Sequence, residues 1–188
     1  KNKDGELLLV MSTQAFQSLT AAQIETLQKH NRILHSSLNT IEAAADPALE
    51  SWLNINAIDD VVKEIIHSPN QVFLAALRNN AGAGGAIVAL ACDKVIGREG
   101  VVLNPHYKNM GLFGSEYWTY LLPKRVGSEM AAAITEQCQP MLMAEALDIH
   151  LVDELFQEDW QSFHNELARF AQSLAAPQVH GGLLRTKQ

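Results

Sequence analysis

The chain has 188 residues, of which 47% are hydrophobic and 19% charged, and its formal net charge is −7 at pH 7. These values fit one globular domain with a sizeable core, and the acidic balance disfavours a nucleic-acid-binding protein. No apolar run is long enough to cross a membrane, and the one near the start is too short for a signal peptide. We therefore expect a cytoplasmic protein. Cys92 and Cys138 lie in apolar segments without metal-ligand spacing, so we expect reduced thiols and no metal site.

The first part of the chain predicts a strand followed by two helices. ELLLV at residues 6–10 is typical of a short buried strand, and residues 20–30 have a helical period. The clearest helix covers residues 46–68, where apolar side chains recur at helical spacing. Asp46 can cap this helix, and Pro47 fits its first turn because a missing N–H needs no partner there.

The rest of the chain alternates strands and helices. The apolar residues 71–78 predict a buried strand, and a glycine-rich turn then leads into a helix. Two short strands, a helix ending at Pro123, two short helices and another strand follow, before an amphipathic terminal helix. This alternation is typical of the α/β class. We expect one domain over residues 1–175 and a tail over residues 176–188.

The glycine-rich turn is the first candidate site. Within RNNAGAGGAIVALACDKV, Gly82, Gly84 and Gly85 separate a strand from an apolar helix. Such a turn presents free backbone N–H groups at a helix N-terminus, where an oxyanion or a phosphate is favoured, and glycine lets a ligand approach closely. The pattern matches neither a Walker loop nor GxGxxG. From these residues alone, a structural turn and an oxyanion hole for a thioester carbonyl both remain open.

Longer motifs extend this interpretation. VFLAALRNNAGAGGAIVALACD resembles the strand, glycine turn and helix of the crotonase (enoyl-CoA hydratase/isomerase) superfamily, and KRVG and MAEALDIHLVDELF resemble two later motifs of that family. The resemblance covers most of the chain from about residue 38. It implies a crotonase-like spiral of ββα units with C-terminal helices. It also implies that the Gly84 N–H holds an acyl-CoA carbonyl, with Gly82 and Gly85 beside the bound group.

Three further segments narrow the resemblance. LNTIEAAADPALESWLNINAIDD, REGVVLNPHYKNMG and GSEYWTYLLP are similar to the C-terminal, crotonase-like half of the HypX (HoxX) family of hydrogenase-maturation proteins. This similarity implies a lyase-type reaction that releases carbon monoxide from formyl-CoA, with coenzyme A as carrier and product. It implies a formyltransferase domain or hydrogenase-maturation proteins as partners. A crotonase fold without such a fused half is usually a homotrimer.

The residues at the family's two catalytic glutamate positions indicate a different chemistry. Ile87 stands at the first position and cannot transfer a proton, so the two-carboxylate hydratase mechanism is absent. His106 stands at the second, where it could move a proton near neutral pH or simply fix a loop by hydrogen bonds. We expect the neighbouring Asn104 and Tyr107 to contact the substrate.

The segment GSEYW supplies a second group of catalytic candidates. Glu116 could be the active carboxylate, or a first-turn acid favoured by the helix dipole. Ser115 and Tyr117 are further candidates on either side of it. A second carbonyl-binding N–H would come from Ser36, in a region that is shorter than the resemblance predicts.

Two other functions remain open from the sequence. One is a generic enoyl-CoA hydratase, isomerase or acyl-CoA hydrolase, which Ile87 disfavours. The other is a non-catalytic domain that binds CoA or takes part in assembly, because the shortened region around Ser36 would remove one of the two carbonyl donors.

Overall fold

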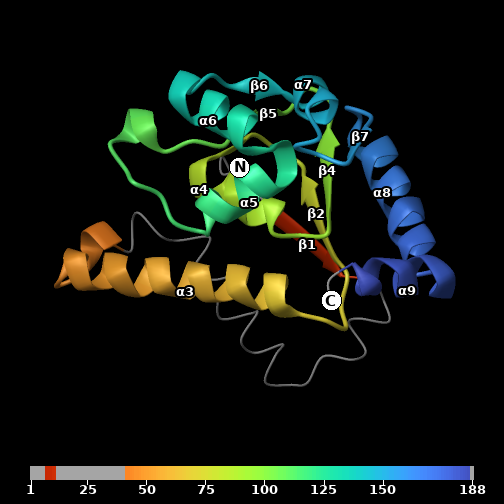
Figure 1. Cartoon of the computed structure of the whole chain (residues 1–188), viewed down its shortest axis with the longest axis horizontal. Helices are drawn as coiled ribbons and strands as arrows, with labels where there is room; N and C mark the ends of the chain where they lie inside the picture. Colours follow the sequence, from red (N-terminus) through yellow and green to blue (C-terminus); the bar gives the residue numbers. More distant parts are fainter. Residues whose placement is uncertain (1–6, 12–40, 187–188) are drawn as a thin grey trace.

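The computed structural model describes residues 7–11 and 41–186, and Figure 1 shows their arrangement. In chain order the elements are β1 (Leu7–Met11), α3 (Pro47–His67), β2 (Phe73–Leu77), β3 (Ala81–Gly82), α4 (Ala83–Leu90), β4 (Lys94–Arg98), β5 (Val102–Asn104), the 3-10 helix η1 (Lys108–Met110), α5 (Trp118–Val126), α6 (Ser128–Gln137), β6 (Met141–Leu142), α7 (Met143–Asp148), β7 (Glu154–Phe156), α8 (Trp160–Leu174) and α9 (Pro177–Arg185). The helix expected at residues 20–30 lies outside the described residues.

Two sheets organise the fold. The larger has the strand order β1-β2-β4-β7, with β1 antiparallel to β2 and the other neighbours parallel. The smaller has the order β3-β5-β6, with β5 parallel to β3 and antiparallel to β6. Helices connect the parallel neighbours, as parallel pairing requires a crossover. The predicted α/β class is therefore confirmed.

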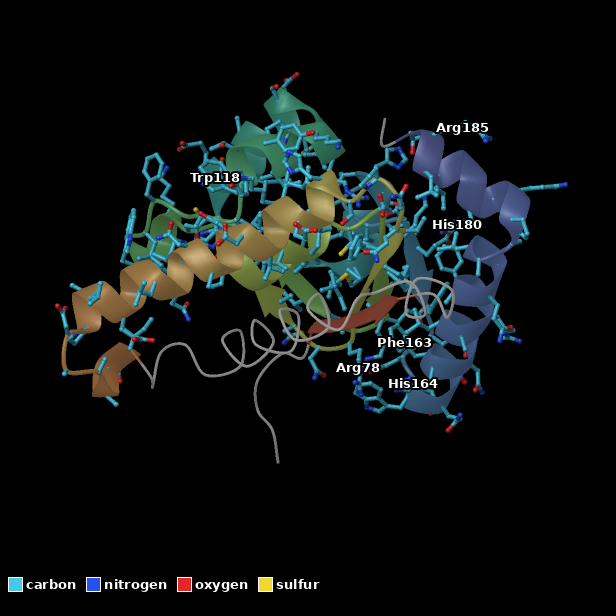
Figure 2. All side chains as sticks on the ribbon, turned by 90° about the horizontal axis from the view of Figure 1, so that it is seen from below. Arg78, Trp118, Phe163, His164, His180 and Arg185 are labelled. Carbon is cyan, nitrogen blue, oxygen red and sulfur yellow. The ribbon has the colours of Figure 1, made fainter. Side chains whose placement is uncertain are left out.

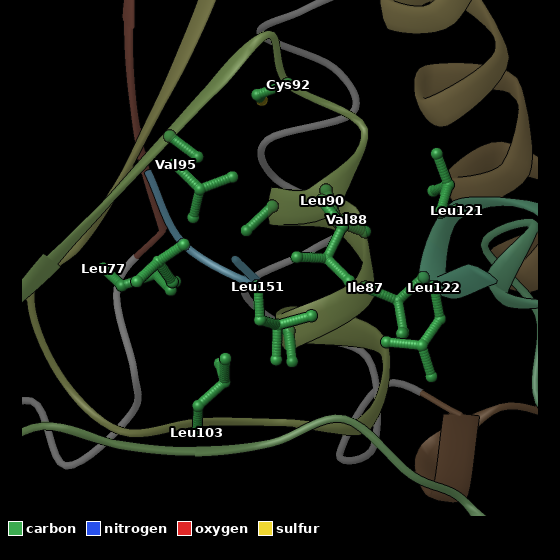
Figure 3. Close-up of a cluster of buried hydrophobic side chains, with 14 of the residues drawn as sticks. Leu77, Ile87, Val88, Leu90, Cys92, Val95, Leu103, Leu121, Leu122 and Leu151 are labelled. Atoms are coloured by element: carbon green, nitrogen blue, oxygen red, sulfur yellow. The ribbon is translucent and has the colours of Figure 1, made fainter. Parts of the chain in front are cut away.

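The central strands β2 and β4 are buried on both faces of the larger sheet, because successive side chains of a strand point in opposite directions. On one face, β2 and β4 pack against α8 through Leu74, Ala76, Ile96, Phe163 and Leu167. On the other face they pack against α4, and Figure 3 shows this cluster. Its labelled side chains are Leu77, Ile87, Val88, Leu90, Cys92, Val95, Leu103, Leu121, Leu122 and Leu151.

Helix α3 begins as the sequence predicts. The Asp46 side chain accepts a 3.0 Å hydrogen bond from the Leu49 N–H, and Pro47 occupies the first turn. The C-terminal half of α3 is anchored by buried Val62 and Ile65. Its N-terminal half extends past α4 and α5 in Figure 1 and leaves Trp52 63% exposed. Only one half of α3 therefore belongs to the core.

Helix α5 differs from the prediction, because it continues through Pro123 instead of ending there. Proline removes one intrahelical hydrogen bond and normally disfavours this position. Tertiary bonds hold the last turn: Arg125 donates 2.7 Å hydrogen bonds to the Asp153 carboxylate and to the Cys92 carbonyl. The short strands β3 and β6 also went unpredicted, and Pro177–Arg185 of the expected tail form helix α9.

Asp153 joins three elements at the edge of the core. Its carboxylate accepts hydrogen bonds from Arg125 at 2.7 Å, from Lys94 at 3.0 Å and from the Val95 backbone N–H at 2.7 Å. Burial alone would raise the pKa of Asp153, but the Arg125 guanidinium, the Val95 N–H and Lys94 together lower it. The carboxylate is thus held ionised between α5 and β4.

An aromatic and cationic cluster, formed by Arg78, Arg98, Trp160 and His164, connects α8 to the ends of β2 and β4. The guanidinium carbons of Arg78 and Arg98 lie 4.5 Å and 4.9 Å from the centre of the Trp160 ring, and His164 stacks on the same ring. Figure 2 shows Arg78 beside Phe163 and His164 of α8. These contacts fix the start of α8 over the sheet.

Candidate functional site

The site begins where β3 runs into α4. Gly82 pairs with Asn104 across the β3–β5 ladder and is the N-cap of α4. The cap makes no side-chain hydrogen bond, and the first N–H groups of a helix have no intrahelical partner. The glycine turn thus forms the N-terminus of α4, and the binding of a carbonyl by its N–H groups stays a prediction.

Gly84 is in direct contact with the Glu116 carboxylate. A β-carbon added to Gly84 would lie 2.6 Å from Oε1 and 2.9 Å from Cδ of Glu116. Real side chains do not approach so closely, so only glycine leaves the carboxylate its place. Glu116 itself is only 5% exposed. The structure therefore brings a buried carboxylate onto the turn that the sequence singled out.

Tyr107 supplies the other contact of this carboxylate, because its hydroxyl donates a hydrogen bond to Oε2 of Glu116. The Tyr107 side chain is buried, and burial raises the pKa of its hydroxyl, as do the hydrogen bond to Glu116 and the negative charges of Glu116 and Asp59. Tyr107 therefore stays protonated as a donor well above neutral pH. The pair gives the site one carboxylate and one protonated hydroxyl in contact.

The Glu116 side chain projects from a tight turn that precedes α5. Glu116 and Tyr117 have φ values of 59° and 55°, which side-chain-bearing residues rarely adopt. Gly114, with φ of 91°, lies so close to the Tyr107 ring that a β-carbon there would be 2.5 Å from Cδ2. The backbone N–H of Glu116 donates a 2.7 Å hydrogen bond to Oδ1 of Asp59 on α3. Because Glu116 precedes the helix and is buried, its interpretation as a first-turn helix acid is wrong.

The other candidates of this turn take different positions. Tyr117 is 42% exposed, and its carbonyl accepts hydrogen bonds from the N–H groups of Tyr120 and Leu121 at the start of α5. The Ser115 carbonyl accepts a 3.2 Å hydrogen bond from the Trp118 N–H. These carbonyl bonds shape the start of α5, and the Ser115 backbone also forms a hydrogen bond that slightly opposes the rise in the pKa of Tyr107. A catalytic role for either stays a prediction.

The buried hydroxyl of Tyr107 makes stability depend on alkaline pH. Its folded pKa lies above the ordinary value of about 10, so above about pH 10 the folded state keeps a proton that the unfolded state has lost. The free energy of unfolding should then fall by about 1.4 kcal/mol per pH unit because of this one group. Urea unfolding above about pH 10 should show this slope in the wild type and lose it in Tyr107→Phe. Tyr120→Phe, at an exposed tyrosine of α5, should keep it, and parallel curves for all three proteins would contradict the prediction.

A match to a protein-family model shows which family this chain belongs to. Residues 23–186 match the model of the enoyl-CoA hydratase/isomerase family. The chain belongs to the enoyl-CoA hydratase/isomerase family. The crotonase-like fold class expected from the sequence is thereby confirmed.

The chain is similar to part of two hydrogenase-maturation proteins. The chain is 50% identical over 119 residues to the hydrogenase maturation factor HoxX of Bradyrhizobium diazoefficiens, a match that covers 63% of this chain and 21% of that protein. A crystal structure of a variant of HypX from Aquifex aeolicus has 47% identity and a TM-score of 0.75, covering 80% of this chain and 28% of that one. Another structure shows the Aquifex aeolicus protein in complex with tetrahydrofolic acid. The chain thus spans between a fifth and a third of these relatives, and the predicted kinship with HypX and HoxX is confirmed.

The wider enoyl-CoA hydratase/isomerase family shares the fold at lower identity. A crystal structure of enoyl-CoA hydratase from Bacillus halodurans matches with a TM-score of 0.65 and 23% identity, over 80% of this chain and 58% of that one. In residues 7–11 and 41–186, no helix is both long and apolar enough to span a bilayer. The same residues bring no three His, Cys, Asp or Glu side chains together as possible metal ligands.

The two residues that the sequence analysis placed at the family's glutamate positions are Ile87 and His106, and both are buried. Ile87 is fully buried in the cluster of Figure 3, so it lies in the core. His106 is buried, and neither its Nδ1 nor Oδ1 of Asn104 has a hydrogen-bond partner in the described part of the chain. Neither is brought into contact with Glu116 by any described bond, so their roles stay predictions. Ser36 lies outside the described residues.

Two other residues of the site, Gly85 and Asp59, differ from what the sequence alone indicates. A β-carbon at Gly85 would meet nothing within 4 Å, so the structure needs glycine at Gly84 for space but not at Gly85. The sequence alone did not identify Asp59 as a partner of Glu116. The only sequence signal was an acidic residue on the helix that carries the longest apolar pattern.

Proposed function

We propose that this chain is a crotonase-like domain that binds formyl-CoA and releases carbon monoxide for hydrogenase maturation in the cytoplasm. One observation carries the proposal: the buried Glu116 carboxylate lies against Gly84, at the donors of the α4 N-terminus, and accepts a hydrogen bond from Tyr107. The similarity to HoxX and HypX supports the biological role. The tetrahydrofolic acid complex of HypX supports a one-carbon substrate, because tetrahydrofolate carries groups at the formyl level.

The geometry supports a balanced reaction in which formyl-CoA gives carbon monoxide and free CoA. The Gly84 N–H polarises the formyl carbonyl, as in an oxyanion hole. The Glu116 carboxylate takes the formyl proton, and the electron pair left on carbon becomes the carbon lone pair of carbon monoxide. The C–S bond breaks with its electrons on sulfur, while an oxygen lone pair forms the third carbon–oxygen bond. The thiolate takes a proton from the Tyr107 hydroxyl, which recovers one from Glu116. No water or oxidant is consumed, so one carboxylate and one hydroxyl suffice.

Partners and assembly form part of the same proposal. The chain spans about a fifth of HoxX, and we place a formyltransferase domain, fused or separate, upstream of this reaction, with hydrogenase-maturation proteins receiving the product. Gly82, Gly85 and Asn104 would contact the acyl-CoA beside Gly84, and Ser36 would supply a second N–H donor. Without the formyltransferase domain the crotonase fold would assemble as a homotrimer.

The first experiment is to incubate the purified protein with formyl-CoA and measure carbon monoxide by its haemoglobin spectrum. We expect release by the wild type and about a 100-fold lower rate for Gly84→Ala, because the added carbon would displace Glu116 from Tyr107. Gly182→Ala on α9, where the added carbon comes no closer than 3.9 Å to Arg185, is the matched control and should keep the wild-type rate.

Two other outcomes would replace the proposal. Hydration of crotonyl-CoA without carbon monoxide release would favour a generic hydratase, isomerase or hydrolase, although buried Ile87 leaves that chemistry one carboxylate short. Binding of CoA without turnover of either thioester would favour a non-catalytic binding or assembly domain.

A further inference from the structure

Asp59 contacts the candidate catalytic residue from a distant part of the sequence. Its Oδ1 accepts a 2.7 Å hydrogen bond from the backbone N–H of Glu116, across a sequence separation of 57 residues. From this contact we infer that Asp59 is a positioning residue, which fixes the direction in which the Glu116 carboxylate projects toward Gly84. The inference rests on the proposed role of Glu116 and adds a residue from α3 to the site.

The turn at Glu116 needs support from outside itself. Both Glu116 and Tyr117 have left-handed backbone angles, which are energetically unfavourable for a residue with a side chain. Such a turn persists only when tertiary contacts hold it. The Glu116 N–H is partly buried, and an unpaired buried N–H is itself costly. A carboxylate acceptor is the stronger kind of partner for that N–H, because one member of the bond is charged.

Asp59 is well placed to give this support. It lies one turn before Val62, which is fully buried, and two turns before Ile65, which is 2% exposed. Toward the N-terminus, α3 leaves the core and exposes Leu53 and Trp52. Asp59 therefore lies at the point where α3 leaves the core, next to the buried part of the helix. The hydrogen bond from the Glu116 N–H to Asp59 therefore holds the Glu116 backbone against a part of α3 that is packed on the core.

The groups around Glu116 show what the loss of Asp59 would change. Tyr107 contacts the carboxylate itself, and α4 contributes the backbone of Gly84. Asp59 accepts the hydrogen bond of the Glu116 backbone N–H, and its charge also acts on the Tyr107 hydroxyl. Asp59 thus touches neither the carboxylate nor the proposed position of the thioester. Its loss should alter the orientation of Glu116, and hence kcat, while leaving KM for the CoA thioester unchanged.

The test compares Asp59→Ala, Asp59→Asn and Asp60→Ala in the formyl-CoA assay. Asp59→Ala should lower kcat about 10- to 100-fold at unchanged KM, since a misplacement of about 1 Å costs this much. Asparagine keeps a carbonyl oxygen as acceptor, so Asp59→Asn should stay within about threefold of the wild type. Asp60→Ala, at an exposed neighbour on α3, is the matched control and should keep both constants. Equal losses in Asp59→Ala and Asp59→Asn, or an unchanged kcat in Asp59→Ala, would overturn the inference.

A second readout does not depend on activity. Amide hydrogen exchange measured by NMR should show the Glu116 N–H protected in the wild type and in Asp59→Asn, and exchanging at least about tenfold faster in Asp59→Ala. Unchanged exchange in Asp59→Ala would overturn the inference. If the wild type releases no carbon monoxide, the proposed function fails, and the exchange rates still decide whether Asp59 holds the turn.

Discussion

Replacing Glu116 with glutamine should lower the rate of carbon monoxide release about 1,000-fold, which is the largest effect on activity that we expect. The amide has nearly the shape of the carboxylate, and its oxygen can still accept the Tyr107 hydrogen bond, but it cannot take a proton from the substrate. The loss should therefore appear in kcat, with KM little changed. The measurement is single-turnover release of carbon monoxide from formyl-CoA.

The matched control for this variant is Glu129→Gln, at an exposed glutamate in the first turn of α6. It removes the same charge at a distance from the site and should keep the wild-type rate. If Glu116→Gln keeps more than about a tenth of the wild-type rate, proton abstraction by Glu116 is excluded and the reaction needs another base. Buried His106 would then be the first residue to test.

The largest effect on stability should come from Asp153→Ala, with a loss of about 3 kcal/mol in the free energy of unfolding near pH 7. The substitution leaves the charges of Arg125 and Lys94 and the Val95 N–H without their shared acceptor. Removing one member of a mostly buried ion pair is costly because the remaining charge stays desolvated. Urea unfolding followed by circular dichroism measures the difference.

The pH dependence of this effect follows from the lowered pKa of Asp153. The folded pKa lies below the unfolded value of about 3.9, so the stabilisation is fully present above that pH and is lost as the pH falls through the folded pKa. The difference between Asp153→Ala and the wild type should therefore shrink below about pH 4. Asp148→Ala, at an exposed residue of α7, should change stability by no more than about 0.5 kcal/mol at any pH. A difference that grows toward acid would show that Asp153 is not held as an ion.

Local sequence patterns predicted much of the fold. Helix α3 follows from its period, its Asp46 cap and Pro47, all of which act within one or two turns. The turn at Gly84 was recognisable because glycine there has a direct geometric reason. Pro123 misled the prediction, since the bonds of Arg125 that offset the lost helical hydrogen bond reach residues 28 and 33 positions away.

The candidate site was only half predictable for the same reason. Glu116 could be identified as a candidate, but an acid before a helix has the same pattern whether it is a first-turn residue or a buried carboxylate. The left-handed backbone at Glu116 and Tyr117 involves no glycine or asparagine that would signal it. The partner Asp59 is 57 residues away, and its neighbours on α3 give no indication of that contact. Such pairings are set by how the helix docks, which local propensity does not encode.

The long sequence separations within this site also have a consequence for how it forms during folding. Asp59, Gly84 and Glu116 lie on three segments that meet only after α3 and α4 have docked on the sheet, so the site has a high contact order even though its parts are small. No isolated segment of the chain can hold the Glu116 carboxylate in place. Partly folded forms of the chain should therefore contain the helices and strands but lack an ordered Glu116 carboxylate, and hence lack activity. The appearance of catalytic activity would then mark the final docking step of the chain.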